Sequence, residues 1–253
     1  MKNTLFGGLA LIIVGSVIWS VIVRPATPHS KIVFVIDESK SIPDDARAGA
    51  HIAVEQNVSQ LKRGDELVLI PLTGDAAIEA PGKVQRVRIS NKRTAYDTDL
   101  KEANAAIRAI LETLREESLA HPYLRTDLLG TITIAAEEKR REEAFNLAII
   151  SDMINDTPNI NFMTHPMLAR EESARKLADE LMFGNQKMWE GARIFLGQLR
   201  STDLKKLRPE RREAIRAFWL QFFRAGGATE VIFATDGPGQ LADFVRTANQ
   251  PRR

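Results

Sequence analysis

A run of apolar residues that ends in an acid and two serines constrains this chain more than any other stretch. Residues 32–36 read IVFVI, and Asp37, Ser39 and Ser41 follow at alternate positions. A short, mostly β-branched run of this kind predicts a strand buried on both faces, as in a parallel sheet covered by helices. Ligands of open α/β sheets bind outside the carboxyl ends of the strands. The sequence therefore places a candidate site where this strand ends.

The three side chains after the strand offer only oxygen ligands, which suit a hard cation. Mg²⁺ prefers oxygen in near-octahedral geometry and usually keeps some of its water. One carboxylate and two hydroxyls supply oxygens without closing such a shell. The same stretch also suits the start of a helix, because a serine can cap a helix whose first turn holds Pro43 and Asp44. The motif alone leaves both interpretations open.

Composition indicates one ordinary globular domain. The chain has 253 residues, of which 44% are hydrophobic and 27% are charged. Its net charge of +2 gives no electrostatic reason to expect a nucleic-acid partner. Cysteine is absent, which excludes disulfides, thiol catalysis and thiolate metal sites.

The amino-terminal segment predicts a membrane anchor. Residues 4–23 carry no charged side chain, and as a helix they would extend ~30 Å, the thickness of a bilayer core. No small-residue cleavage motif follows closely, so we expect a retained signal anchor within residues 1–24 and a single-pass protein. Residues 25–30 contain two prolines and are expected to form a stiff linker. Residues 31–249 are expected to form the domain, and residues 250–253 a short tail. We expect the domain to lie outside the cytoplasm.

Apolar runs and helical patterns alternate along the rest of the chain. The expected strands after the first cover residues 66–72, 84–89, 145–151, 192–199 and 230–234. The expected helices cover residues 43–61, 99–118, 126–136, 166–182, 204–223 and 240–249. This alternation predicts an α/β fold with a doubly wound, mostly parallel six-stranded sheet and helices on both faces.

With the elements in order, the chain resembles the von Willebrand factor type A domains and their metal-ion-dependent adhesion site. The spacing Asp37-x-Ser39-x-Ser41 after an apolar strand matches the first motif of that site. A threonine that opens a helix after the third strand matches the second, and an aspartate at the end of the fourth strand matches the third. The resemblance implies a Rossmann-like fold and a Mg²⁺ or Mn²⁺ site made of Asp37, Ser39, Ser41, Thr126 and Asp152.

The resemblance also implies a function in protein binding rather than catalysis. A divalent ion surrounded by neutral hydroxyls and only two carboxylates is poorly neutralised and attracts a further anionic oxygen. The expected partner is a protein that offers a Glu or Asp carboxylate. The sequence thus predicts a membrane-tethered, metal-dependent protein-binding module.

A second aspartate competes for the third motif. The segment Ala234-Thr235-Asp236-Gly237 also ends an apolar run with a carboxylate. In the sheet order that the resemblance implies, the sixth strand lies at the far edge, whereas the fourth lies beside the first. We therefore assign Asp152 to the site, and we expect Asp236 to belong to a turn or helix cap.

Two other functions are compatible with the residues. One is a Mg²⁺-dependent phosphatase of the haloacid dehalogenase type, with Asp37 as nucleophile and with Thr73 and Asp156 as partners. It would require Ser39 as general acid, a role that a serine fills poorly at neutral pH. The other is a metal-free interaction module. The resembled family usually has glycine near the threonine of the second motif and after the aspartate of the third, whereas here Arg125 precedes Thr126 and Met153 follows Asp152.

Overall fold

The computed structural model describes residues 30–80, 82–121, 123–139 and 144–248. The predicted anchor, most of the predicted linker and the predicted tail lie outside these ranges. The first strand begins at Ser30, the last residue of the predicted linker. Within the described ranges, no helix has both the length and the apolar character that crossing a bilayer requires.

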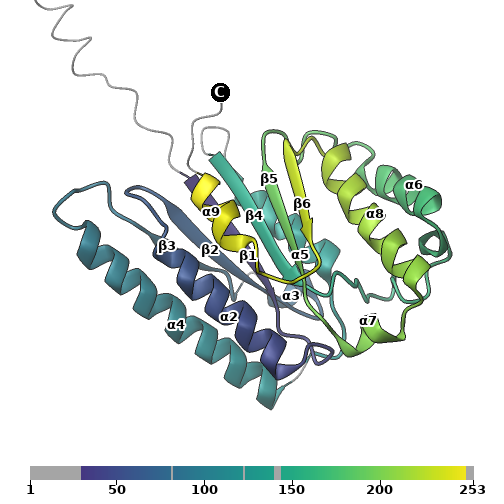
Figure 1. Ribbon diagram of the computed structural model, residues 1–253, viewed down its shortest axis with the longest axis horizontal. Coiled ribbons are helices and arrows are strands. Elements are labelled where there is room, and N and C mark those ends of the chain that lie inside the picture. Colours follow the sequence, from purple (N-terminus) through teal and green to yellow (C-terminus); the bar gives the residue numbers. More distant parts are fainter. Residues whose placement is uncertain (1–29, 81, 122, 140–143, 249–253) are drawn as a thin grey trace, which may run out of the picture.

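Six strands form one sheet in the order β3-β2-β1-β4-β5-β6 (Figure 1). All neighbouring strands are parallel except β3, which is antiparallel to β2. The strands are β1 (Ser30–Asp37), β2 (Glu66–Leu72), β3 (Gln85–Arg88), β4 (Ala144–Ser151), β5 (Arg193–Gln198) and β6 (Glu230–Ala234). The predicted mostly parallel six-stranded sheet is confirmed.

Burial along the strands follows their place in the sheet. All eight residues of central β1 are buried, as a strand covered on both faces requires. Edge strand β3 has four residues, three of them exposed, and its arginines alternate with Val87. This short, charged strand leaves little exposed backbone for pairing with another chain.

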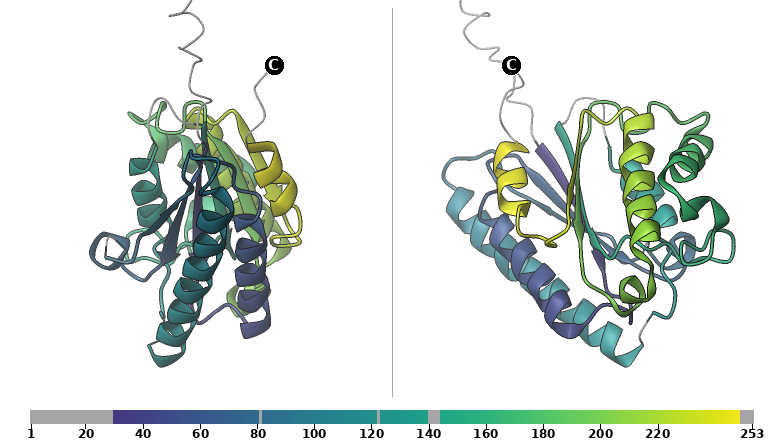
Figure 2. Two further views of the ribbon diagram at one scale, coloured as in Figure 1. Left: turned by 90° about the vertical axis from the view of Figure 1, so that its left-hand side faces the viewer. Right: turned by 45° about the vertical axis from the view of Figure 1, so that its right-hand side comes forward.

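Helices cover both faces of the sheet (Figure 2). The side chains of β1 alternate between the two cores on these faces. Val33 and Val35 belong to a core that includes α5 (Leu128–Glu137), α6 (Glu171–Met182) and α8 (Pro209–Ala225). Phe34 and Ile36 belong to a second core, with α2 (Asp44–Val58), α4 (Tyr96–Ala120) and α9 (Leu241–Ala248). The doubly wound arrangement is therefore present.

Several helix boundaries differ from the sequence prediction. The helix expected over residues 166–182 is interrupted at Arg170, whose backbone is extended, and divides into η1 (Pro166–Ala169) and α6. The helix expected over residues 204–223 consists of α7 (Thr202–Lys206) and α8, because Pro209 starts a new helix. A further short helix, α3 (Ala76–Glu79), was not expected.

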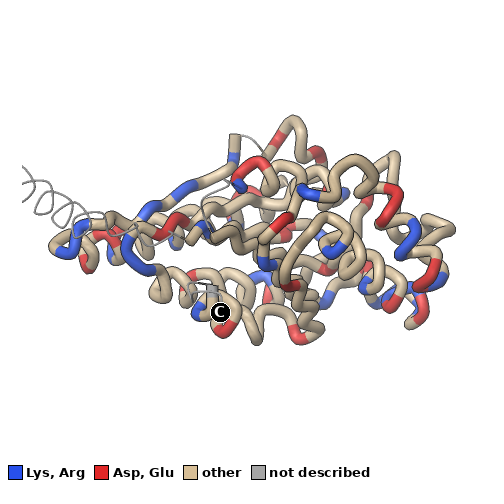
Figure 3. The backbone as a smooth tube through the Cα atoms, turned by 90° about the horizontal axis from the view of Figure 1, so that it is seen from above, with Lys and Arg blue, Asp and Glu red and all other residues tan. Residues whose placement is uncertain are grey.

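Acidic and basic residues are interspersed over the described chain (Figure 3). On α6, Glu171 and Arg175 form an ion pair one helical turn apart, as do Glu172 and Lys176. These are solvated helix surfaces of the kind that the mixed charge pattern of the sequence indicates.

Candidate metal centre

The exits of β1 and β4 lie side by side. These strands pair in parallel, with Ile36 opposite Ile150, so Asp37 and Asp152 leave the sheet at the same edge. Strand β6 is separated from β1 by β4 and β5, and Asp236 follows β6 in an exposed turn. The sheet order therefore puts Asp152, and not Asp236, beside the first motif.

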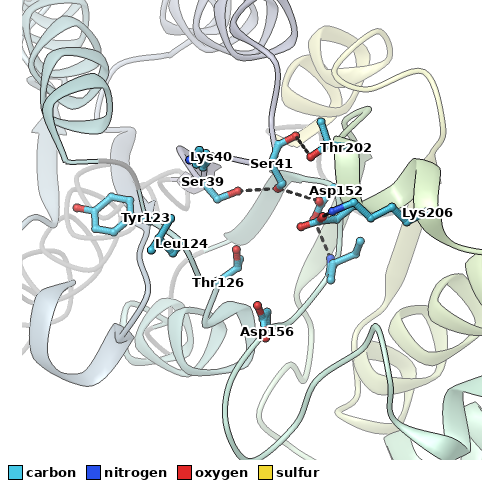
Figure 4. A pocket seen from close by; sticks show the side chains of 12 residues that line it. Ser39, Lys40, Ser41, Tyr123, Leu124, Thr126, Asp152, Asp156, Thr202 and Lys206 are labelled. Carbon is cyan, nitrogen blue, oxygen red and sulfur yellow. Dashed lines mark hydrogen bonds and ion pairs between the residues drawn. The ribbon is translucent and has the colours of Figure 1, made fainter.

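Four of the five predicted site residues line one pocket of about 350 Å³, which Figure 4 shows from close by. The hydroxyl oxygens of Ser39 and Ser41 lie 3.0 Å apart. The Ser41 hydroxyl donates a hydrogen bond of 3.2 Å to Oδ2 of Asp152. Thr126 comes from the segment before α5 and completes the group of oxygen-bearing side chains around the opening.

Asp37, the fifth predicted residue, lies beneath this pocket and does not line it. Its side chain is fully buried (0% exposed). One carboxylate oxygen accepts from the Ser39 N–H at 2.9 Å, and the other accepts from the Ser151 hydroxyl at 2.7 Å. Asp37 therefore joins the loop after β1 to the end of β4 from behind the pocket wall.

The negative charges of the two aspartates repel each other. Burial raises the pKa of Asp37, although hydrogen bonds from Ser39 and Ser151 act in the other direction. Burial, together with the nearby charge of Asp37, raises the pKa of Asp152 from 3.8 to about 7. Ionising both carboxyls in this buried setting is costly, and a bound cation would offset that cost.

The residues at the pocket fit a hard divalent cation. Among the described residues, no cluster of three or more His, Asp or Glu side chains is placed to hold a metal. The pocket instead combines the hydroxyls of two serines and a threonine with the carboxylate of Asp152. Hydroxyl and carboxylate oxygens are the donors that Mg²⁺ and Mn²⁺ accept. Two lysines also line the pocket: Lys206 is paired with Asp203 at 2.6 Å, and Lys40 is exposed.

The residue after Asp152 has an unusual backbone conformation. Met153 has φ of +66°, and it is the only non-glycine residue with a positive φ in the described ranges. Such a conformation disfavours any residue with a Cβ atom and suits glycine. A glycine would adopt this conformation without steric cost, whereas the methionine adopts it with its Cβ atom in place.

The local structure around Thr126 differs from the prediction. The helix does not open at Thr126, because Asp127 caps it by accepting from the Gly130 N–H and α5 begins at Leu128. Instead, Thr126 and Asp156 exchange backbone hydrogen bonds: the Asp156 N–H donates at 2.8 Å and the Thr126 N–H at 3.4 Å. The position of the threonine therefore depends on the segment after β4.

Asp156 is a pocket residue that the metal-site prediction missed. It lines the same pocket, and its carboxylate accepts from the Asn161 side chain at 2.6 Å. The sequence signal was the spacing Asp152-x-x-x-Asp156, which we considered only for the phosphatase alternative. Its place opposite Thr126 follows from a tertiary contact between two loops.

No model of a known protein family and no characterised protein sequence matches the chain. Among solved structures, it is similar to a von Willebrand factor type A protein from Catenulispora acidiphila, at 14% identity and a TM-score of 0.46. That match covers 88% of this chain and 42% of the other. It is also similar to the manganese-loaded TRAP protein of Plasmodium vivax, at 11% identity and a TM-score of 0.38, over 78% of this chain and 74% of the other. This chain thus spans less than half the length of the first protein.

Proposed function

We propose that this chain is a metal-dependent protein-binding module. In this proposal, Ser39, Ser41, Thr126 and Asp152 hold Mg²⁺ or Mn²⁺ at the pocket, and Asp37 acts on the ion through its charge from beneath, without direct contact. The observation that carries the proposal is a buried pair of carboxyls at a hydroxyl-lined pocket: Asp152 lines the pocket and Asp37 lies beneath it, and the pKa of Asp152 is raised to about 7. A cation at this pocket would offset the repulsion between the two carboxylates.

The donor set favours capture of an anionic group from outside. The two serines and the threonine bring no charge, and Asp37 lies behind the pocket wall. When bound, the ion supplies a Lewis-acidic position that accepts a carboxylate oxygen. A Glu or Asp side chain of a partner protein is therefore the proposed ligand.

Membrane tethering is part of the same proposal. Residues 4–23 would span the bilayer, with the domain outside the cytoplasm. Strand β1 runs from Ser30 to Asp37, so the candidate site lies at the opposite end of this strand from the proposed anchor. A tether of residues 25–29 would measure only ~15 Å as polyproline II. This arrangement would present the pocket away from the membrane.

The burial of Asp37 is the reason to prefer binding over catalysis. A phosphatase nucleophile must reach the phosphorus atom, whereas both carboxylate oxygens of Asp37 are hydrogen-bonded inside the protein. We therefore propose a non-enzymatic role.

The decisive experiment is calorimetric titration of the domain with MnCl₂ and with MgCl₂. Asp37→Ala should abolish binding and retain the folded circular dichroism spectrum, whereas Asp236→Ala, at the exposed turn, should bind like the wild type. Undiminished binding by Asp37→Ala would refute the assignment. Hydrolysis of p-nitrophenyl phosphate by the wild type that is lost in Asp37→Ala would instead favour the phosphatase.

A further inference from the structure

A single peptide unit connects a core tryptophan to the carboxylate of Asp152. The Trp219 Nε1–H donates a buried hydrogen bond of 2.9 Å to the carbonyl of Met153. The N–H of Ile154 belongs to the same peptide unit and donates to Oδ1 of Asp152 at 2.9 Å. Because the peptide is planar, fixing its carbonyl also fixes the direction of its N–H.

This peptide needs support, because it follows a strained residue. Met153 holds φ at +66°, where a residue with a Cβ atom is disfavoured. Its own N–H donates to the Ser151 hydroxyl at 3.1 Å, and its side chain is fully buried. Rotation of the Met153–Ile154 peptide towards an ordinary conformation would withdraw the N–H from Asp152.

Trp219 is itself rigidly placed. It is fully buried in α8, and its ring centroid lies 5.6 Å from that of Phe162 and 4.9 Å from that of Phe218. The indole N–H therefore has a fixed position from which it can hold the Met153 carbonyl.

We propose that Trp219 is a positioning residue of the metal site. Through the Met153–Ile154 peptide, it fixes Oδ1 of Asp152 on the protein side and leaves Oδ2 to Ser41 and the pocket. The inference rests on the proposed function and deepens it, because it makes α8 part of the site although α8 supplies no metal ligand.

The chain offers a matched control for this role. Trp189 is also fully buried in the same core, but its Nε1 has no hydrogen-bond partner among the described residues. Trp219→Phe and Trp189→Phe thus remove the same atoms from one core, and only Trp219→Phe removes a bond to the Met153 carbonyl. We expect Mn²⁺ affinity to fall about tenfold in Trp219→Phe, as loss of one buried hydrogen bond implies, and less than about twofold in Trp189→Phe.

A second measurement needs no metal. In chelator, hydrogen exchange of the Ile154 amide should become about tenfold faster in Trp219→Phe, relative to the amides of β4. Trp189→Phe should leave this ratio unchanged.

Backbone replacement tests the conformational part of the argument. Met153→Gly and Met153→Ala both remove the buried side chain, but only glycine adopts positive φ without steric cost. Adding Trp219→Phe should therefore weaken Mn²⁺ binding much less in the glycine background than in the alanine background.

The outcomes separate this inference from the proposed function. A wild-type protein that binds no Mn²⁺ overturns the proposed function, and the Ile154 exchange rate then decides the role of Trp219. Equal exchange rates of Ile154 in wild type and Trp219→Phe, or equal effects of Trp219→Phe in the two Met153 backgrounds, would overturn the inference.

Discussion

Replacing Asp152 with asparagine should stabilise the metal-free domain at pH 8 while removing its affinity for Mg²⁺. Asparagine keeps the shape of the side chain and can still accept from the Ile154 N–H. It removes a negative charge that is buried near Asp37. The substitution therefore measures separately how much the ionised carboxylate destabilises the metal-free domain and how much it contributes to metal affinity.

The magnitude follows from the raised pKa of Asp152. Its pKa is about 7 in the folded protein, against the ordinary value of 3.8, so between these values the folded state binds a proton that the unfolded chain releases. Stability of the metal-free wild type therefore falls as pH rises through this window. At about 1.4 kcal/mol per pKa unit, the loss at pH 8 is up to about 4 kcal/mol. Asp152→Asn avoids this loss.

Urea denaturation in chelator at pH 5 and pH 8 measures the effect. The advantage of Asp152→Asn over the wild type should grow by a few kcal/mol between these pH values, whereas Asp236→Asn, at an exposed turn, should follow the wild type. Saturating Mg²⁺ should raise the stability of the wild type and not that of Asp152→Asn. An advantage that does not change with pH would show that the Asp152 carboxylate is well solvated, and the electrostatic argument would then fail.

Three further perturbations test other parts of the molecule. Thr126→Ala should weaken Mn²⁺ binding in calorimetry several-fold with little change in thermal stability, since it removes one hydroxyl from the pocket wall; equal affinity would exclude Thr126 as a ligand. Arg47→Met should destabilise the domain in denaturation by about 3 kcal/mol, because it leaves the buried carboxylate of Glu38, 3.3 Å from the Arg47 Nε, without that partner. Deleting residues 1–24 should move the protein from the membrane fraction to the soluble fraction with its fold intact, and a full-length protein already in the soluble fraction would contradict the anchor.

The sequence by itself determined the class of fold and most of the elements. The strands were recognisable because their burial on both faces demands unbroken apolar runs such as residues 32–36 and 66–72. Residues 230–234 form β6 with the predicted bounds. The sequence predicted the boundaries of the helices less accurately than those of the strands. Local breaks such as Arg170 and Pro209 end or restart a helix within a pattern that remains apolar at helical spacing.

The sequence also selected the residues of the candidate site, because acids and hydroxyls that end parallel strands meet at one edge of the sheet. Only the tertiary structure decided where each of these side chains lies. Whether a carboxylate lines the pocket or lies beneath it depends on neighbours distant in sequence, such as Ser151 for Asp37. The conformation of Met153 and its bond to Trp219, 66 residues away, depend on how α8 packs against the end of β4. Such contacts are invisible in a linear pattern because no local propensity encodes them.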